Sequence, residues 1–195
     1  VGRVSHFISR KAMDIDGLGS ETIQLMMQNN LINSYADLYV VTVEDLIPLE
    51  RLAEKSAQNI VQAVAASIAV PFTRVLFALG IRYVGQTVAK KLAQHFGSID
   101  ALAIATKEAL EAVDEIGTRI AESVIEFFES PENHRIIEQL RTAGVQLEQR
   151  AEDGPVSNVL TDLRFVVSGV FTAFSRDELK LLIEQHGGKI VSSIS

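Results

Sequence analysis

The feature that most constrains the fold of this chain is a short pattern that occurs four times at nearly constant spacing. Each copy has an apolar residue, two variable residues, a second apolar residue and a small residue, followed by polar residues and an amphipathic run. The small residues are Gly19, Ala53, Gly85 and Gly117, so successive copies are 34, 32 and 32 residues apart. A period of this length is typical of one supersecondary unit repeated along the chain. We therefore expect four similar units.

The run after each small residue has the apolar period of a helix and not the alternation of a strand. In the third copy, for example, Val88, Ala89, Leu92 and Phe96 fall on one helical face. Each unit is thus predicted as two helices joined by a hairpin, with residues 1–150 all-helical and hairpins at 16–19, 50–53, 82–85 and 114–117. The apolar residues predicted to lie in the core are Ile23, Leu52, Ile60, Val84, Leu92, Ile116, Ile120 and Val124.

The hairpins also indicate a binding chemistry. The first N–H groups of a helix have no partner inside the helix, and together with the helix dipole they attract anions. A small residue just before the helix lets another backbone come close. The pattern therefore predicts phosphate binding by main-chain amides, supported by hydroxyl and cationic side chains near the start of each helix. The predicted site comprises Gly17, Gly19, Ser20, Lys55, Gly85, Thr87, Lys90, Gly117, Thr118 and Arg119.

The net charge of −7 argues at first against nucleic acid as a partner. The charge is unevenly distributed, because residues 1–95 carry a net +1 and residues 96–150 a net −6. A nucleic-acid surface on the first three units would have to rely on amide dipoles more than on a basic patch. A glycine turn between helices is also often only a connection. A scaffold that binds proteins is therefore an alternative, above all for the fourth unit.

Several stretches resemble one family closely. Residues 2–7 (GRVSHF) and 10–19 (RKAMDIDGLG) look like the start of the tandem helix-hairpin-helix domain in the C-terminal part of bacterial NAD-dependent DNA ligase. Residues 54–59 (EKSAQN) and 78–85 (ALGIRYVG) are similar to further blocks of that domain. The resemblance covers about residues 1–150. It departs at the second hairpin, where the family usually has glycines and this chain has Arg51 and Ala53.

The pattern changes after residue 150. Residues 151–160 are predicted to be a polar linker. Residues 161–195 are predicted to hold a buried strand over Leu163–Val170, a helix capped by Ser175 and ending near Gly187, and a second strand from Lys189. This order is similar to the N-terminal part of a BRCT domain, which follows the helix-hairpin-helix domain in the family. The predicted fold class is mostly α, with four tandem helix-hairpin-helix repeats followed by an incomplete α/β (βαβ) BRCT-like segment.

The resemblance also implies a function. It implies a non-specific DNA-backbone-binding region of an NAD-dependent DNA ligase, which joins the 5′-phosphate and 3′-hydroxyl of single-strand nicks in duplex DNA during replication and repair. The implied location is the cytoplasm, at the bacterial nucleoid. The family's adenylation lysine lies in a Lys-x-Asp-Gly motif that this chain lacks, so no catalytic residue is expected here. NAD, Mg and Zn are implied for the parent enzyme, together with adenylation, OB and zinc-finger domains of the same polypeptide.

Three hypotheses follow for the function. The first is the ligase module, and the second is a helix-hairpin-helix module of another DNA-repair protein, such as a nuclease or junction-binding subunit. The third is the protein-interaction scaffold. The block at residues 10–19 and the BRCT-like segment favour the ligase. No metal or membrane is expected as a partner, since the chain has no Cys, its four His are scattered, and no apolar run approaches the roughly 20 residues of a membrane span. The chain opens on Val1, and we expect it to begin inside a longer polypeptide.

Overall fold

The computed structural model describes residues 1–50, 52–150, 159–169, 171–172 and 174–191. The chain divides into two compact units, Val1–Gln149 and Arg150–Ser195, and each is described by itself. Only Val159 and Leu160 of the predicted linker at 151–160 are among the described residues.

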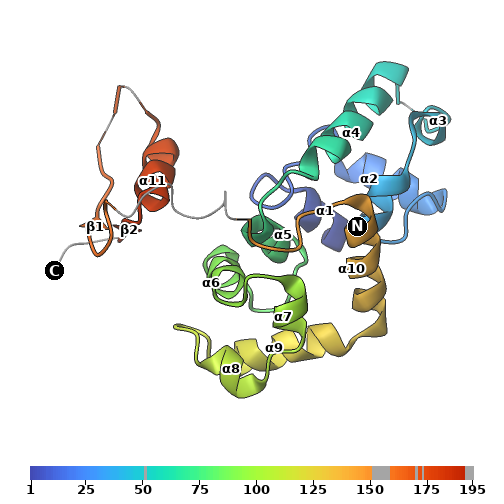
Figure 1. Ribbon diagram of the computed structural model, residues 1–195. Coiled ribbons are helices and arrows are strands. Elements are labelled where there is room, and N and C mark those ends of the chain that lie inside the picture. Colours follow the sequence, from blue (N-terminus) through green and yellow to red (C-terminus); the bar gives the residue numbers. More distant parts are fainter. Residues whose placement is uncertain (51, 151–158, 170, 173, 192–195) are drawn as a thin grey trace. The chain divides into compact units, whose positions relative to one another are not determined.

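The first unit is built of helices (Figure 1). Each predicted hairpin joins two helices that contact each other, namely α1 with α2, α3 with α4, α5 with α6, and α8 with α9. The only extended pairing among the described residues of this unit is an isolated bridge between Ser98 and Glu148. The prediction of a mostly helical fold is confirmed. The elements are α1 (Gly2–Ile8), α2 (Ser20–Gln28), the 3-10 helix η1 (Tyr35–Val40), α3 (Val43–Leu46), α4 (Glu54–Ser67), α5 (Phe72–Ala78), α6 (Gln86–Phe96), α7 (Ile99–Ala103), α8 (Lys107–Glu111), α9 (Thr118–Glu129) and α10 (Pro131–Ala143).

The apolar faces of these helices meet in one core. Six of the eight residues predicted to lie there are buried, and they are Ile23, Ile60, Val84, Leu92, Ile116 and Val124. The prediction was wrong for Leu52 and Ile120, which are half-buried and pack against the edge of the core.

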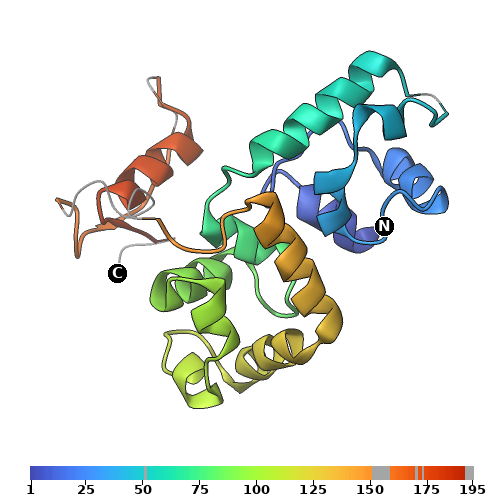
Figure 2. The same cartoon turned by 45° about the vertical axis from the view of Figure 1, so that its right-hand side comes forward.

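The helices of the first unit are grouped in two halves. Figures 1 and 2 show α1–α4 together on one side and α6–α9 on the other, with α5 and α10 between them. Ser130 ends α9 and is also the N-cap of α10, so the chain turns sharply between these two helices. α10 then packs against η1. It thereby connects the last hairpin unit to the first half of the domain.

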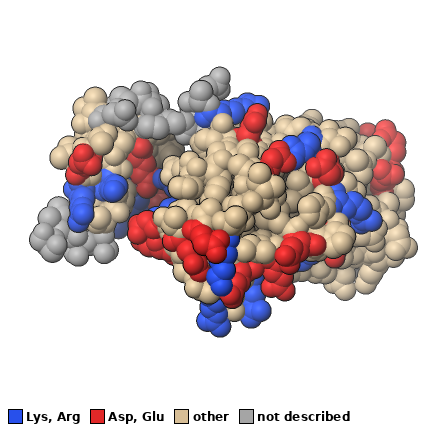
Figure 3. All heavy atoms as spheres, turned by 60° about the horizontal axis from the view of Figure 1, so that its bottom comes forward, with Lys and Arg blue, Asp and Glu red and all other residues tan. Residues whose placement is uncertain are grey.

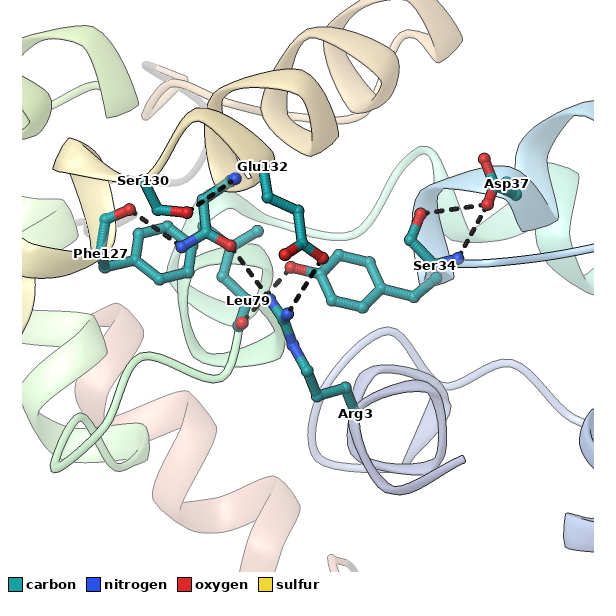
Figure 4. A network of polar contacts seen from close by, with 9 residues as sticks. Arg3, Ser34, Asp37, Leu79, Phe127, Ser130 and Glu132 are labelled. Atoms are coloured by element: carbon teal, nitrogen blue, oxygen red, sulfur yellow. Dashed lines mark hydrogen bonds and ion pairs between the residues drawn. The ribbon is translucent and has the colours of Figure 1, made fainter. Parts of the chain in front are cut away.

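Polar contacts accompany the packing of α10 against the first half of the domain (Figure 4). Arg3 of α1 donates a hydrogen bond of 3.1 Å to the Asn133 side chain and lies 3.7 Å from the Glu132 carboxylate, both at the start of α10. The hydroxyl of Tyr35 donates to the Leu79 carbonyl at 3.4 Å. Burial raises the pKa of Tyr35 to about 12. These contacts link α1 to the start of α10, and η1 to the residue that follows α5.

The second unit holds one parallel strand pair and a helix. β1 (Arg164–Phe165) pairs with β2 (Lys189–Ile190), and α11 (Arg176–Gln185) connects them. Ser175 caps α11 in a capping box with Glu178, as its place before the helix predicts. The predicted βαβ order is confirmed.

The predicted long buried strand over Leu163–Val170 is wrong in its extent. Only Arg164 and Phe165 are paired, Phe165 is half-buried, and Leu163 and Val166 are exposed, while Val170 lies outside the described residues. Among the described residues, β2 is the only neighbour of β1 in the sheet.

Candidate functional site

The four hairpin helices start in the same way. α2, α4, α6 and α9 begin one residue after Gly19, Ala53, Gly85 and Gly117, and each of these N-cap residues has an extended backbone. None of the four accepts a side-chain cap hydrogen bond, because glycine and alanine carry no oxygen on their side chains. The N–H groups of the first turn therefore face outward without a side-chain acceptor at the N-cap.

Most other helices of the molecule are capped. The hydroxyls of Thr42, Ser98, Thr106 and Ser130 accept hydrogen bonds from the first turns of α3, α7, α8 and α10. α1 and α5, whose N-caps are Val1 and Pro71, have no side-chain cap. The four starts that follow the hairpins, which we call open helix starts, thus lack a side-chain acceptor, as do the starts of α1 and α5.

The fold does not need glycine at three of these starts. Gly19, Gly85 and Gly117 have negative φ angles of −79°, −80° and −86°, which any residue adopts. A Cβ built on each of them would meet nothing within 4 Å. Glycine here keeps the helix start uncovered, so that another group can approach the amides.

Gly17 has a different reason to be glycine. Its φ is +87°, and an added Cβ would meet Cγ1 of Ile60 in α4 at 3.3 Å. The corresponding residues two positions before Gly85 and Gly117 are Tyr83 and Glu115, and they also have positive φ, at 64° and 67°. The positive φ therefore belongs to the hairpin turn, and at Gly17 a close approach of α4 is added to it.

The predicted supporting side chains are placed at the hairpin helices as expected. Ser20, Lys55, Thr87, Thr118 and Arg119 are exposed in first turns. Lys90 differs, because it lies in the second turn of α6 and is half-buried. In α9 the N–H of Ile120 donates to the Gly117 carbonyl at 3.0 Å, which leaves Thr118 and Arg119 as its outward-facing donors.

Two side chains of the third hairpin were missing from the prediction. The guanidinium carbon of Arg82 lies 4.9 Å from the centre of the Tyr83 ring, and that of Arg119 lies 4.8 Å from it. The available signal was that Arg82-Tyr83 occupies the place of Asp16-Gly17 and Asp114-Glu115 in other copies. The cluster brings the third and fourth hairpins together.

Lys91 also joins these two hairpins. Its ammonium lies 3.0 Å from the carboxylate of Asp114 and 3.0 Å from that of Glu115. Hydrogen bonds to Glu115 and Asp114 raise the pKa of Lys91 above its ordinary value. The acidic fourth hairpin is thus partly neutralised by α6.

Charge on the surface is mixed. On the face shown in Figure 3, blue Lys and Arg side chains lie among red Asp and Glu side chains, without a continuous basic surface. The described residues contain no group of three or more His, Cys, Asp or Glu placed to hold a metal ion. In the same residues no single helix is long and apolar enough to cross a membrane, and α4 and α5 meet that requirement only together, with a bend of 119°.

Comparison with known proteins agrees with this arrangement. Residues 9–66 match the model of the SAM-like helix-hairpin-helix tandem, and residues 74–137 match that of the helix-hairpin-helix motif. Residues 155–195 match the model of the BRCA1 C Terminus (BRCT) domain. The chain is 57% identical to DNA ligases of Flavobacterium psychrophilum and Flavobacterium johnsoniae and 46% identical to the DNA ligase of Porphyromonas gingivalis, in each case over 100% of its own length.

This chain is homologous to a DNA ligase along its entire length. It spans 29% of the length of these relatives. Both the four-hairpin domain and the BRCT-like segment are therefore similar to parts of these DNA ligases. The resemblance expected from the blocks at residues 2–19, 54–59 and 78–85 is confirmed.

Proposed function

We propose that the first unit holds duplex DNA by its sugar–phosphate backbone, without base specificity, within a DNA ligase that seals single-strand nicks. The observation that carries this proposal is the set of open helix starts at Gly19, Gly85 and Gly117. Amides at a helix N-terminus bind phosphate oxygens, and contacts to phosphates carry no sequence information. The ligase relatives make DNA the appropriate phosphate source.

The chemistry of sealing belongs to other parts of such an enzyme. We propose that the parent protein is NAD-dependent, acts in replication and repair at the bacterial nucleoid, and uses NAD, Mg and Zn outside this chain. The sequence has no Lys-x-Asp-Gly motif that would carry AMP, and no Cys that would bind zinc as a thiolate. The role left to the residues of this chain is to position nicked duplex DNA for the adenylation, OB and zinc-finger domains of the same polypeptide.

The test is binding of the 195-residue chain to nicked duplexes of two unrelated sequences. We expect Gly19→Val and Gly85→Val to weaken binding to both duplexes by about tenfold each, the order of one hydrogen bond to a charged group. Gly2→Val is the matched control, since an added Cβ at exposed Gly2 also meets nothing within 4 Å. Equal affinities of the parent and both hairpin variants would mean that the hairpins are only turns, and the scaffold alternative would then hold.

A further inference from the structure

We infer that Arg82, Tyr83 and Arg119 form one phosphate-binding cluster that the third and fourth hairpins build jointly. This inference rests on the proposed binding of the DNA backbone, and it names side chains that would contact the phosphates. The ring of Tyr83 has two guanidinium groups within 5 Å of its centre, one from its own hairpin and one from the first turn of α9. A cation at this distance from an aromatic ring is attracted to the ring. The ring therefore orients both cations at one place.

Both cations are available to an anion. Arg82 and Arg119 are exposed, and neither makes an ion pair with a carboxylate among the described residues. Each lies within 5 Å of the same ring centre, so the two positive charges lie within about 10 Å of each other. An anion placed between them would relieve their mutual repulsion. Guanidinium groups also match phosphate oxygens in geometry.

The hairpin turn requires a positive φ at the position of Tyr83, as Glu115 of the fourth hairpin also shows with a φ of 67°. A bulky residue at a positive φ is disfavoured, and Tyr83 has a φ of 64°. The corresponding position of the first hairpin is Gly17, which the turn accommodates without strain. Tyr83 remains 42% exposed, so burial does not explain the choice of tyrosine. Orientation of the two arginines does explain it.

Lys91 reduces the electrostatic repulsion that the acidic fourth hairpin would otherwise exert on a bound phosphate. The carboxylates of Asp114 and Glu115 lie close in sequence to Arg119 and would repel a phosphate. The Lys91 ammonium contacts both carboxylates at 3.0 Å. These carboxylates are 88% and 62% exposed, so the pairs contribute little to stability. Their effect is to compensate negative charge beside the cluster.

The ligand that fits is the phosphate backbone of one DNA strand. Phosphates follow each other along a strand at about 3.4 Å of rise, so two nearby guanidinium groups can contact the same or consecutive phosphates. The amides at the starts of α6 and α9 belong to the same two hairpins. The third and fourth hairpins would thus bind DNA through arginine side chains as well as through main-chain amides.

The experiment measures binding of the 195-residue chain to nicked duplex at several salt concentrations. We expect Arg82→Ala and Arg119→Ala each to weaken binding by about tenfold, and the log–log salt slope to become shallower by about 0.9 for each cation lost. Arg135→Ala in α10 is the matched control, because it removes the same charge from an exposed arginine outside the hairpins. The double variant should lose about 1.8 from the slope.

Substitutions of Tyr83 and Lys91 test whether these side chains act on DNA binding and not on the stability of the fold. Tyr83→Asn removes the ring but keeps a residue that tolerates positive φ, so the thermal unfolding midpoint should not fall while binding weakens by about fivefold. Lys91→Gln should weaken binding, and adding Asp114→Asn and Glu115→Gln should restore it. If the arginine variants match Arg135→Ala while Gly85→Val still weakens binding, the cluster is refuted and the amide proposal stands. If the parent chain binds no DNA, both are refuted.

Discussion

Two kinds of helix start in the first unit differ in whether the N-cap side chain accepts a hydrogen bond from the first-turn N–H groups. The helices α3, α7, α8 and α10 begin with a hydroxyl that accepts their first N–H groups. The helices α2, α4, α6 and α9 begin with glycine or alanine, whose side chains offer these groups no acceptor. A substitution at one kind of start should therefore change stability, and at the other kind DNA binding.

The largest effect is expected from giving an open start its own cap. Gly85→Asp places a carboxylate at the N-cap of α6, where it accepts from the first-turn amides and interacts favourably with the helix dipole. We expect affinity for nicked duplex to fall by about a hundredfold, since the carboxylate both occupies the amides and repels phosphate, while the free energy of unfolding stays the same or rises. Unfolding in urea and a binding titration of the same sample measure the two quantities.

Gly85→Ser is the matched variant without the charge. Its hydroxyl can cap α6 but repels no phosphate, so it should weaken binding less than Gly85→Asp does. Unchanged affinity in both variants would contradict the claim that the uncapped helix starts bind DNA.

An intermediate effect is expected from removing a cap where the chain supplies one. Thr106→Ala and Ser98→Ala each delete an oxygen that accepts a first-turn N–H, at 3.2 Å and 3.1 Å. We expect each to lower the free energy of unfolding by about 1 kcal/mol. Affinity for DNA, measured below the unfolding transition, should stay at the parent value. A loss of affinity comparable to that of Gly85→Val would show that capped starts bind DNA as well.

The smallest effect concerns pH and the junction between the two halves of the unit. Burial alone would raise the pKa of Asp37, but hydrogen bonds from Asn33, Ser34 and Gln139 hold it below its ordinary value of 3.8. A depressed folded-state pKa stabilises the protein above the unfolded pKa, and this contribution is lost as the pH falls through the folded value. We expect acid unfolding below pH 3.8 to be less steep in Asp37→Asn. Identical acid profiles of parent and variant would contradict this.

Much of this arrangement could be predicted from the sequence because it is local. The small residue and the helical period after it fixed the starts of α2, α6 and α9, and Ser175 fixed that of α11. The Arg82–Tyr83–Arg119 cluster could not be predicted, because it depends on which hairpins become neighbours. Nor could the compensation of Asp114 and Glu115 by Lys91, which lies 23 residues away from Asp114. Charge counted along the chain therefore overstated the acidity of the fourth hairpin.

The most direct test of open helix starts is to follow the backbone amide resonances of the 195-residue chain while nicked duplex is added. The largest shifts should occur at the first-turn amides of the hairpin helices, such as Ser20 in α2, Gln86 and Thr87 in α6, and Thr118 in α9. The first turns of α7, α8 and α10, whose amides already have hydroxyl acceptors, should stay nearly unchanged. Shifts that are equal at the two kinds of start, or confined to the capped ones, would contradict the assignment of the hairpins as the DNA contact.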